Sequence, residues 1–137
     1  MTAWLSLLGM ARRAGAVAVG EAPAGEAVQD HKARLVLVAA DAGETTRARM
    51  ERLASDRLPV KQVPASRQEL GGAVGFASAA AVAITDLGFA AAVAGKLAAE
   101  DPEWQSAADT LSQRQSKALR RKADTAKHGK KSKRRKP

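Results

Sequence analysis

The sequence of 137 residues predicts an α/β layered sandwich around a small, mostly buried sheet, followed by a basic tail. Short aliphatic runs alternate with segments of helical periodicity over the first 98 residues, which is typical of layered α/β domains. Hydrophobic residues make up 45% of the chain and aromatic residues only 3%, so the core must be aliphatic. A segment of this length suffices for one core and no second domain.

The first two helices are predicted from apolar spacing and from residues that favour helix ends. Trp4, Leu8 and Ala11 recur at helical spacing, and Gly15 follows as a terminator. Pro23 suits the first turn of a second helix that runs to about residue 32. We therefore expect a helix on each side of the short apolar run at 16–19.

Later helices are predicted where a side chain can accept a hydrogen bond from a free backbone N–H at a helix start. We expect one helix to end near residue 56, a short one to end at the glycines 71, 72 and 75, and a last one to run through about residue 99. The capping residues are Asp41 with Glu44, Ser66 with Glu69, and Thr85 or Asp86.

Four aliphatic runs predict the strands of the sheet. The run at 35–39 is continuously apolar, which is typical of a strand buried on both faces. The other three runs are also short and aliphatic. They cover residues 16–19, 60–63 and 80–85.

The formal charge of +9 is distributed unevenly along the chain. It is +2 over residues 1–98, −4 over 99–111 and +11 over 112–137. We therefore predict a folded domain at 1–99, an acidic linker at 100–111 and a basic tail at 112–137. Residues 105–124 are compatible with a helix, and the like-charged run from Lys127 is expected to be disordered.

Several functional classes are excluded by residue type. Cysteine is absent, which excludes disulfides and thiolate chemistry. His31 and His128 are the only histidines and neither has a second ligand at metal-binding spacing, so we expect no catalytic residues, no metal and no cofactor. The apolar runs are too short for a membrane span and the N-terminus does not resemble a secretory signal, so we expect a cytoplasmic protein. We also expect no small-molecule substrate.

The basic tail gives the strongest chemical signal. Lysines and arginines on such a segment displace counterions from a phosphate backbone. No aromatic residues lie between them, so stacking on single-stranded bases is not indicated. The alternative is a tail that only confers solubility. The candidate phosphate-binding residues are Lys117, Arg120, Arg121, Lys122, Lys130, Lys131, Lys133, Arg134, Arg135 and Lys136.

Two further candidates lie in the predicted domain. Arg12 and Arg13 either complement the dipole of the first helix or, with the turn at Gly20 and Glu21, form an edge that binds RNA. The small apolar loop after residue 75, with Phe76, Ala77 and Ser78, either packs inside or contacts splayed bases. The sequence leaves both pairs of alternatives open. These residues are Arg12, Arg13, Gly20, Glu21, Phe76, Ala77 and Ser78.

Five segments follow one another in a distinctive order along residues 4–98. They are LLGMARRAG, GE at the start of a helix, ARLVLVAADAGETTRARM, VPASRQELGGAVG and AVAITDLGFAAAV. Their order resembles the L7Ae/L30e ribosomal protein family, most closely its short bacterial, YlxQ-like branch. The resemblance implies a three-layer α/β/α sandwich with a small mixed sheet and RNA binding, in the best-known members to kink-turns.

Within the resemblance, Gly20 matches the glycine before the helix that reads the RNA, and Gly75 precedes the apolar loop. Kink-turn binders carry Asn-Glu or Lys-Gln two and three residues after that first glycine, and a Lys further on. Here these positions are Ala22, Pro23 and Glu26. Alanine and proline side chains form no hydrogen bonds with base edges, so we expect RNA binding without standard kink-turn specificity.

The sequence thus predicts a non-enzymatic RNA-binding protein of the ribosomal-protein type, associated with the ribosome or with translation. The expected partners are RNA, ribosomal RNA first, and the ribosome itself. Two alternatives are a module that binds a translation or RNA-processing protein, and a recognition subunit of an RNA-modifying enzyme.

Overall fold

One mixed four-stranded sheet forms the centre of the protein. The computed structural model describes the backbone of residues 3–135 and the side chains of residues 3–121. The strand order is β1-β4-β2-β3; β4 is antiparallel to β1 and β2, and β3 is parallel to β2. The strands are β1 (Val17–Val19), β2 (Leu35–Val38), β3 (Val60–Gln62) and β4 (Ala81–Ile84).

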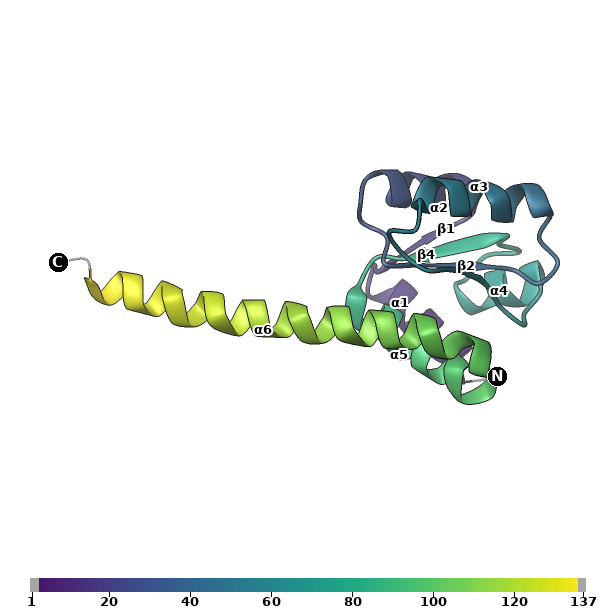
Figure 1. The fold of residues 1–137 in the computed structure, drawn as a ribbon. Coiled ribbons are helices and arrows are strands. Elements are labelled where there is room, and N and C mark those ends of the chain that lie inside the picture. Colours follow the sequence, from purple (N-terminus) through teal and green to yellow (C-terminus); the bar gives the residue numbers. More distant parts are fainter. Residues whose placement is uncertain (1–2, 136–137) are drawn as a thin grey trace.

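Helices cover both faces of this sheet (Figure 1). Two helices pack on one face, α2 (Glu21–Gln29) and α3 (Glu44–Ala54). The other face is covered by α1 (Ala3–Arg13), α4 (Arg67–Ala73) and α5 (Leu87–Glu100). The predicted α/β/α sandwich with a small mixed sheet is confirmed.

Strand β2 supplies side chains to two separate cores. Leu35 and Leu37 pack with α1, α4 and α5, while Val36 and Val38 pack with α2 and α3. Successive side chains of a strand point to opposite faces, and helices cover both faces of this sheet. Every residue of β2 and of β4 is therefore buried. The predicted burial of the run at 35–39 on both faces is confirmed.

Two of the predicted helix caps are present. The Ser66 Oγ accepts a hydrogen bond from the Glu69 backbone N–H at 3.1 Å, and the Ser66 N–H donates to Glu69 Oε1 at 3.0 Å, which completes a capping box. The Asp86 Oδ2 accepts from the Phe89 N–H at 3.0 Å. Helices α4 and α5 therefore begin where the sequence predicts.

The predicted cap at Asp41 is wrong. Helix α3 begins after Gly43, and Asp41 Oδ1 instead accepts a hydrogen bond from the Arg67 backbone N–H at 2.7 Å. The loops after β2 and β3 lie together because these strands are parallel neighbours. Asp41 therefore stabilises the start of α4, which a local pattern does not reveal.

Gly71 and Gly72 do not end a helix, contrary to the prediction, because both lie inside α4, which continues to Ala73. Gly71 instead permits close contact between α4 and the loop before β4. A Cβ atom placed on Gly71 would lie 2.6 Å from the Ser78 Cα, whereas one on Gly72 would meet nothing within 4 Å.

Residues 100–111 form part of the folded domain, which corrects their prediction as a linker. The 3-10 turn η1 (Pro102–Trp104) leads into α6 (Gln105–Arg135). Trp104 is only 1% exposed, and it shares with Ala107, Ala108 and Leu111 the core of α1 and α5. The acidic side chains of this segment are mostly exposed, and its apolar side chains are buried. The net negative charge therefore suggests a linker although the apolar residues pack in the core.

Beyond this anchor, α6 continues as a helix that extends away from the sandwich (Figure 1). It passes the expected end near residue 124 and runs to Arg135. Lysine and arginine, which make up most of residues 125–135, have favourable helix propensities. Within residues 3–135, the helices are too short or too polar for any of them to cross a membrane.

Replacing Gly71 by alanine should destabilise the fold. The added methyl group would overlap the Ser78 backbone, and overpacking of this kind costs about 1–3 kcal/mol. Gly72→Ala is the matched control, because it adds a methyl group in open space of the same helix and should stabilise the protein by up to about 1 kcal/mol. Urea unfolding of both variants measures the difference, and equal stabilities would contradict this account.

Leu111→Ala should cost about 2–5 kcal/mol, because Leu111 is fully buried where α6 meets α5. Leu119→Ala removes the same side chain from a site that is 62% exposed and should change the free energy of unfolding by less than about 0.5 kcal/mol. Thermal unfolding compares the two. If Leu111→Ala were as harmless as Leu119→Ala, the first turns of α6 would not belong to the cooperative unit.

Candidate functional site

The loop of residues 75–80 and the start of α2 lie at the same end of the sheet. Gly20 directly follows β1, and its N–H donates to the carbonyl of Ala81, the first residue of β4, at 2.8 Å. Gly20 has φ 103° and ψ 159°, a conformation that is nearly restricted to glycine. The turn at Gly20 is thereby fixed beside the strand into which the apolar loop leads.

The carboxylate of Glu21, at the first position of α2, is held by side chains of α3. Thr46 Oγ1 donates to Glu21 Oε2 at 3.1 Å, and Arg49 Nη1 lies 3.5 Å from Glu21 Oε1. A carboxylate at this position is stabilised by the helix dipole. Glu21 therefore joins α2 to α3. A helix N-terminus without such a carboxylate attracts phosphate, whereas Glu21 places a negative charge there.

Thr46 and Arg49 could not be identified as partners of Glu21 from the sequence, because no local spacing connects two different helices.

The three departures from the kink-turn pattern all lie on the exposed surface of α2. They are Ala22, Pro23 and Glu26.

The apolar loop is anchored to α4 on both sides. The Phe76 N–H donates to the Gly71 carbonyl at 2.8 Å, and the Ala79 N–H donates to the Arg67 carbonyl at 2.9 Å. Between these bonds Phe76 is 44% exposed, and Ala77 and Ser78 are exposed as well. The alternative in which Phe76 packs inside the core does not hold, and a fixed apolar tip faces outward.

Arg12 lies against this loop. Its guanidinium carbon is 5.7 Å from the centre of the Phe76 ring, within the range of a cation–π contact. Arg13 reaches back along α1, so that its Nη1 would lie 3.7 Å from a Cβ on Gly9. The turn expected beside these arginines is elsewhere: α1 enters β1 at Ala16, which accepts from the Thr85 N–H at the strand end opposite Gly20.

Other cations at this end of the sheet are paired with acids. Arg49 pairs with Glu21, and Arg67 Nε lies 3.7 Å from Asp41 Oδ1. Exposed ion pairs of this kind contribute little to stability, but they reduce the positive potential that an RNA would meet. The candidate edge is therefore apolar at its tip and only weakly basic.

The basic residues of α6 lie apart from this edge. Lys117, Arg120 and Arg121 are exposed, and their spacing places them on neighbouring turns of one helix. Lys136 lies outside the described residues. The other candidate bases of the tail lie within the described backbone of α6. They are Lys122, Lys130, Lys131, Lys133, Arg134 and Arg135.

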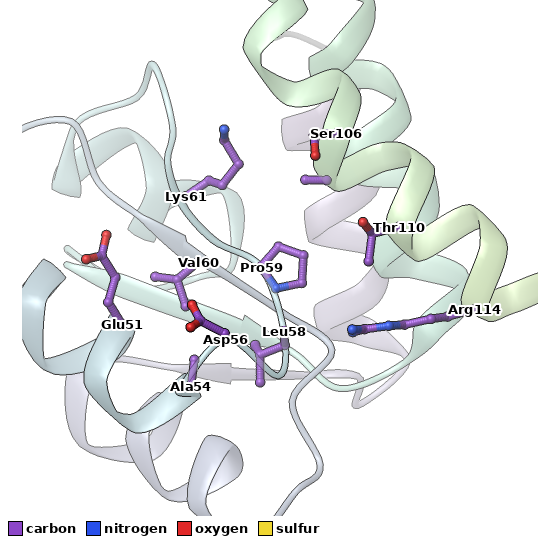
Figure 2. Close-up of a pocket in the computed structure, with 11 residues that line it drawn as sticks. Glu51, Ala54, Asp56, Leu58, Pro59, Val60, Lys61, Ser106, Thr110 and Arg114 are labelled. Atoms are coloured by element: carbon purple, nitrogen blue, oxygen red, sulfur yellow. The ribbon is translucent and has the colours of Figure 1, made fainter.

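An open groove of about 410 Å³ lies between α6 and the end of α3 with β3 (Figure 2). Glu51 and Asp56 line one side, Lys61 another, and Thr110 and Arg114 project from α6. Within the described residues, no group of three acids or histidines is placed to bind a metal ion.

Comparison with known proteins extends these observations. The family described as "Ribosomal protein L7Ae/L30e/S12e/Gadd45 family" matches residues 2–94. The RNA-binding protein YlxQ of Bacillus subtilis (strain 168) is 36% identical over 88 residues, which cover 64% of this chain and 87% of the relative.

Two solved structures are similar in fold. A protein of unknown function from Bacillus halodurans superposes with a TM-score of 0.67 and 35% identity, over 71% of this chain and 98% of that one. The Giardia lamblia 15.5kD RNA binding protein has a TM-score of 0.56 and 23% identity, over 69% and 84% of the two chains. The second similarity concerns the fold alone.

Proposed function

Because the chain belongs to the L7Ae/L30e/S12e/Gadd45 family of ribosomal proteins, we propose that it is a non-enzymatic protein that binds RNA and associates with the ribosome. The single observation that supports this most is α6, a helix whose exposed basic residues extend beyond the packed domain. The name of the YlxQ relative supports the same class of ligand.

In this proposal α6 supplies most of the affinity. Lysine and arginine side chains that neutralise phosphates release counterions, so binding is strong at low salt and weak at high salt. Contacts of this kind position a protein on RNA but do not read its sequence. The domain then contributes shape, through the exposed loop around Phe76 and the nearby guanidinium of Arg12.

The start of α2 does not carry the polar side chains with which kink-turn binders read base edges. Ala22 and Pro23 are exposed but offer no side-chain donor or acceptor, and Glu26 would repel phosphate. Glu21 is held by α3. The proposed RNA is therefore recognised without the G·A contacts of a standard kink-turn, and ribosomal RNA in the cytoplasm is the expected target.

Neutralising the exposed bases of α6 should weaken binding and flatten its salt dependence. We expect the triple variant Lys117→Gln, Arg120→Gln, Arg121→Gln to reduce the slope of log affinity against log salt by about 0.7–0.9 for each phosphate that these side chains neutralise. Filter binding to a ribosomal RNA fragment at several salt concentrations measures this. The control Lys117→Arg, Arg120→Lys, Arg121→Lys keeps the charge and should bind like the original chain.

A chain ending after Ser116 extends this experiment to the whole tail while keeping the Leu111 anchor. Affinity and slope that stay unchanged in this truncated chain would show that α6 is not the phosphate-binding element. Capture of a translation protein that survives nuclease treatment would favour the interaction-module alternative.

A standard kink-turn should bind no better than the same RNA with its G·A pairs replaced by Watson–Crick pairs. The reason is the missing polar reader, since each base contact contributes about 1–3 kcal/mol of discrimination. Gel shifts with both RNAs test this, and tight, salt-resistant preference for the kink-turn would contradict it. The variant Ala22→Asn, Pro23→Glu, Glu26→Lys restores the family pattern and should gain preference for the kink-turn.

A further inference from the structure

Three arginines converge at the end of the molecule opposite the apolar loop. Arg34, Arg57 and Arg114, here called the arginine cluster, line one hollow of about 150 Å³. The Arg34 N–H donates to the Ile84 carbonyl at 2.7 Å, whereas Gly20 bonds to Ala81 at the other end of β4. The cluster is thus separated from the candidate edge by the length of the sheet.

The three arginines come from three different elements. Arg34 precedes β2, Arg57 follows α3, and Arg114 lies on α6. Figure 2 shows the Arg114 side chain reaching from α6 toward Leu58 and Pro59. Only the anchoring of α6 on the domain brings Arg114 to this place, so the cluster cannot be recognised from the sequence.

The Arg57 guanidinium is fixed at the end of α3. Its Nη2 donates to the Leu53 carbonyl at 3.0 Å, its Nε donates to the Ala54 carbonyl at 3.3 Å, and its Nη1 contacts the His31 ring. Free carbonyls at a helix C-terminus attract cations, which explains this position. A guanidinium has five N–H donors, so some still face outward.

The arginine cluster has no acidic partner among the described side chains, where the ion pairs involve other residues. Glu51, which lines the adjacent groove, pairs with Arg47 at 3.1 Å. Asp56 also lines that groove beside Arg114, but it forms no ion pair within the described part of the chain. Like charges in one hollow repel each other, and an anion bound there would relieve the repulsion.

We propose that the arginine cluster binds phosphate groups of an RNA backbone and forms a second RNA-binding surface, continuous with α6. The proposal rests on the proposed function and names a site for it on the folded domain. Arginine is the side chain best suited to bind phosphate, because its planar fork donates two parallel hydrogen bonds.

Continuity with α6 favours a polymer over a free anion. Arg114, Lys117 and Arg121 are three and seven residues apart, so they lie along one face of the helix. The cluster thus begins a basic track that continues outward along α6. The three arginines of the cluster are exposed. The cluster therefore lacks the enclosure that would hold a small anion.

The double variant Arg34→Gln, Arg114→Gln in the full chain tests this surface. Arg57 is kept, since it also caps α3. The control Arg47→Gln, Lys96→Gln removes the same charge from exposed positions outside the cluster. Both are titrated with an RNA duplex of arbitrary sequence at several salt concentrations, and with inorganic phosphate. Thermal unfolding checks that both remain folded.

We expect the double variant to bind RNA more weakly and to lower the salt slope by about 1.8, the value for two duplex phosphates that are no longer neutralised. The control should keep both values close to those of the original chain. Equal behaviour of the two variants, or phosphate binding at the cluster without any effect on RNA, would overturn the proposal alone. If the original chain bound no RNA, the proposed function would fail as well.

Discussion

The burial of β2 and β4 on both faces is the constraint on which the rest of the structure depends. Their aliphatic side chains point alternately into two cores, so helices must cover the sheet on both sides. Layers on both faces leave only the two ends of the sheet for loops. Both candidate surfaces lie at these ends, and α6 packs outside the α5 layer.

The two ends differ in the way their charges are compensated. At the end with the apolar loop, Arg49 and Arg67 are paired with acids, and Glu21 occupies the start of α2. At the opposite end, the arginine cluster has no such partners among the described residues. Arginines without an acidic partner thus gather where α6 leaves the domain, although the family resemblance directs attention to the other end.

Local patterns in the sequence predict what depends on neighbouring residues and miss what depends on folding. The Ser66 capping box and the doubly buried run at 35–39 follow from such patterns, and both are confirmed. Asp41 caps a different helix from the one predicted, because its partner, the Arg67 N–H, follows another strand. The burial of Trp104 in the core is not predicted, because the acidic residues around it suggest a linker. Similarly, the contact of Arg12 with Phe76 requires the packing of α1 on α4.

The anchor at Leu111 changes the physical role of the basic tail. A flexible tail would search for phosphates in all directions, whereas a helix fixed at its first turns holds its charges along one line from the domain. Lys117 and Arg121 are four residues apart and repel each other by about 0.2–0.5 kcal/mol, a repulsion that a phosphate backbone would remove. RNA bound along α6 should thus stabilise the helical conformation of α6. The domain accordingly does more than tether the cations: it sets the direction in which they extend from it.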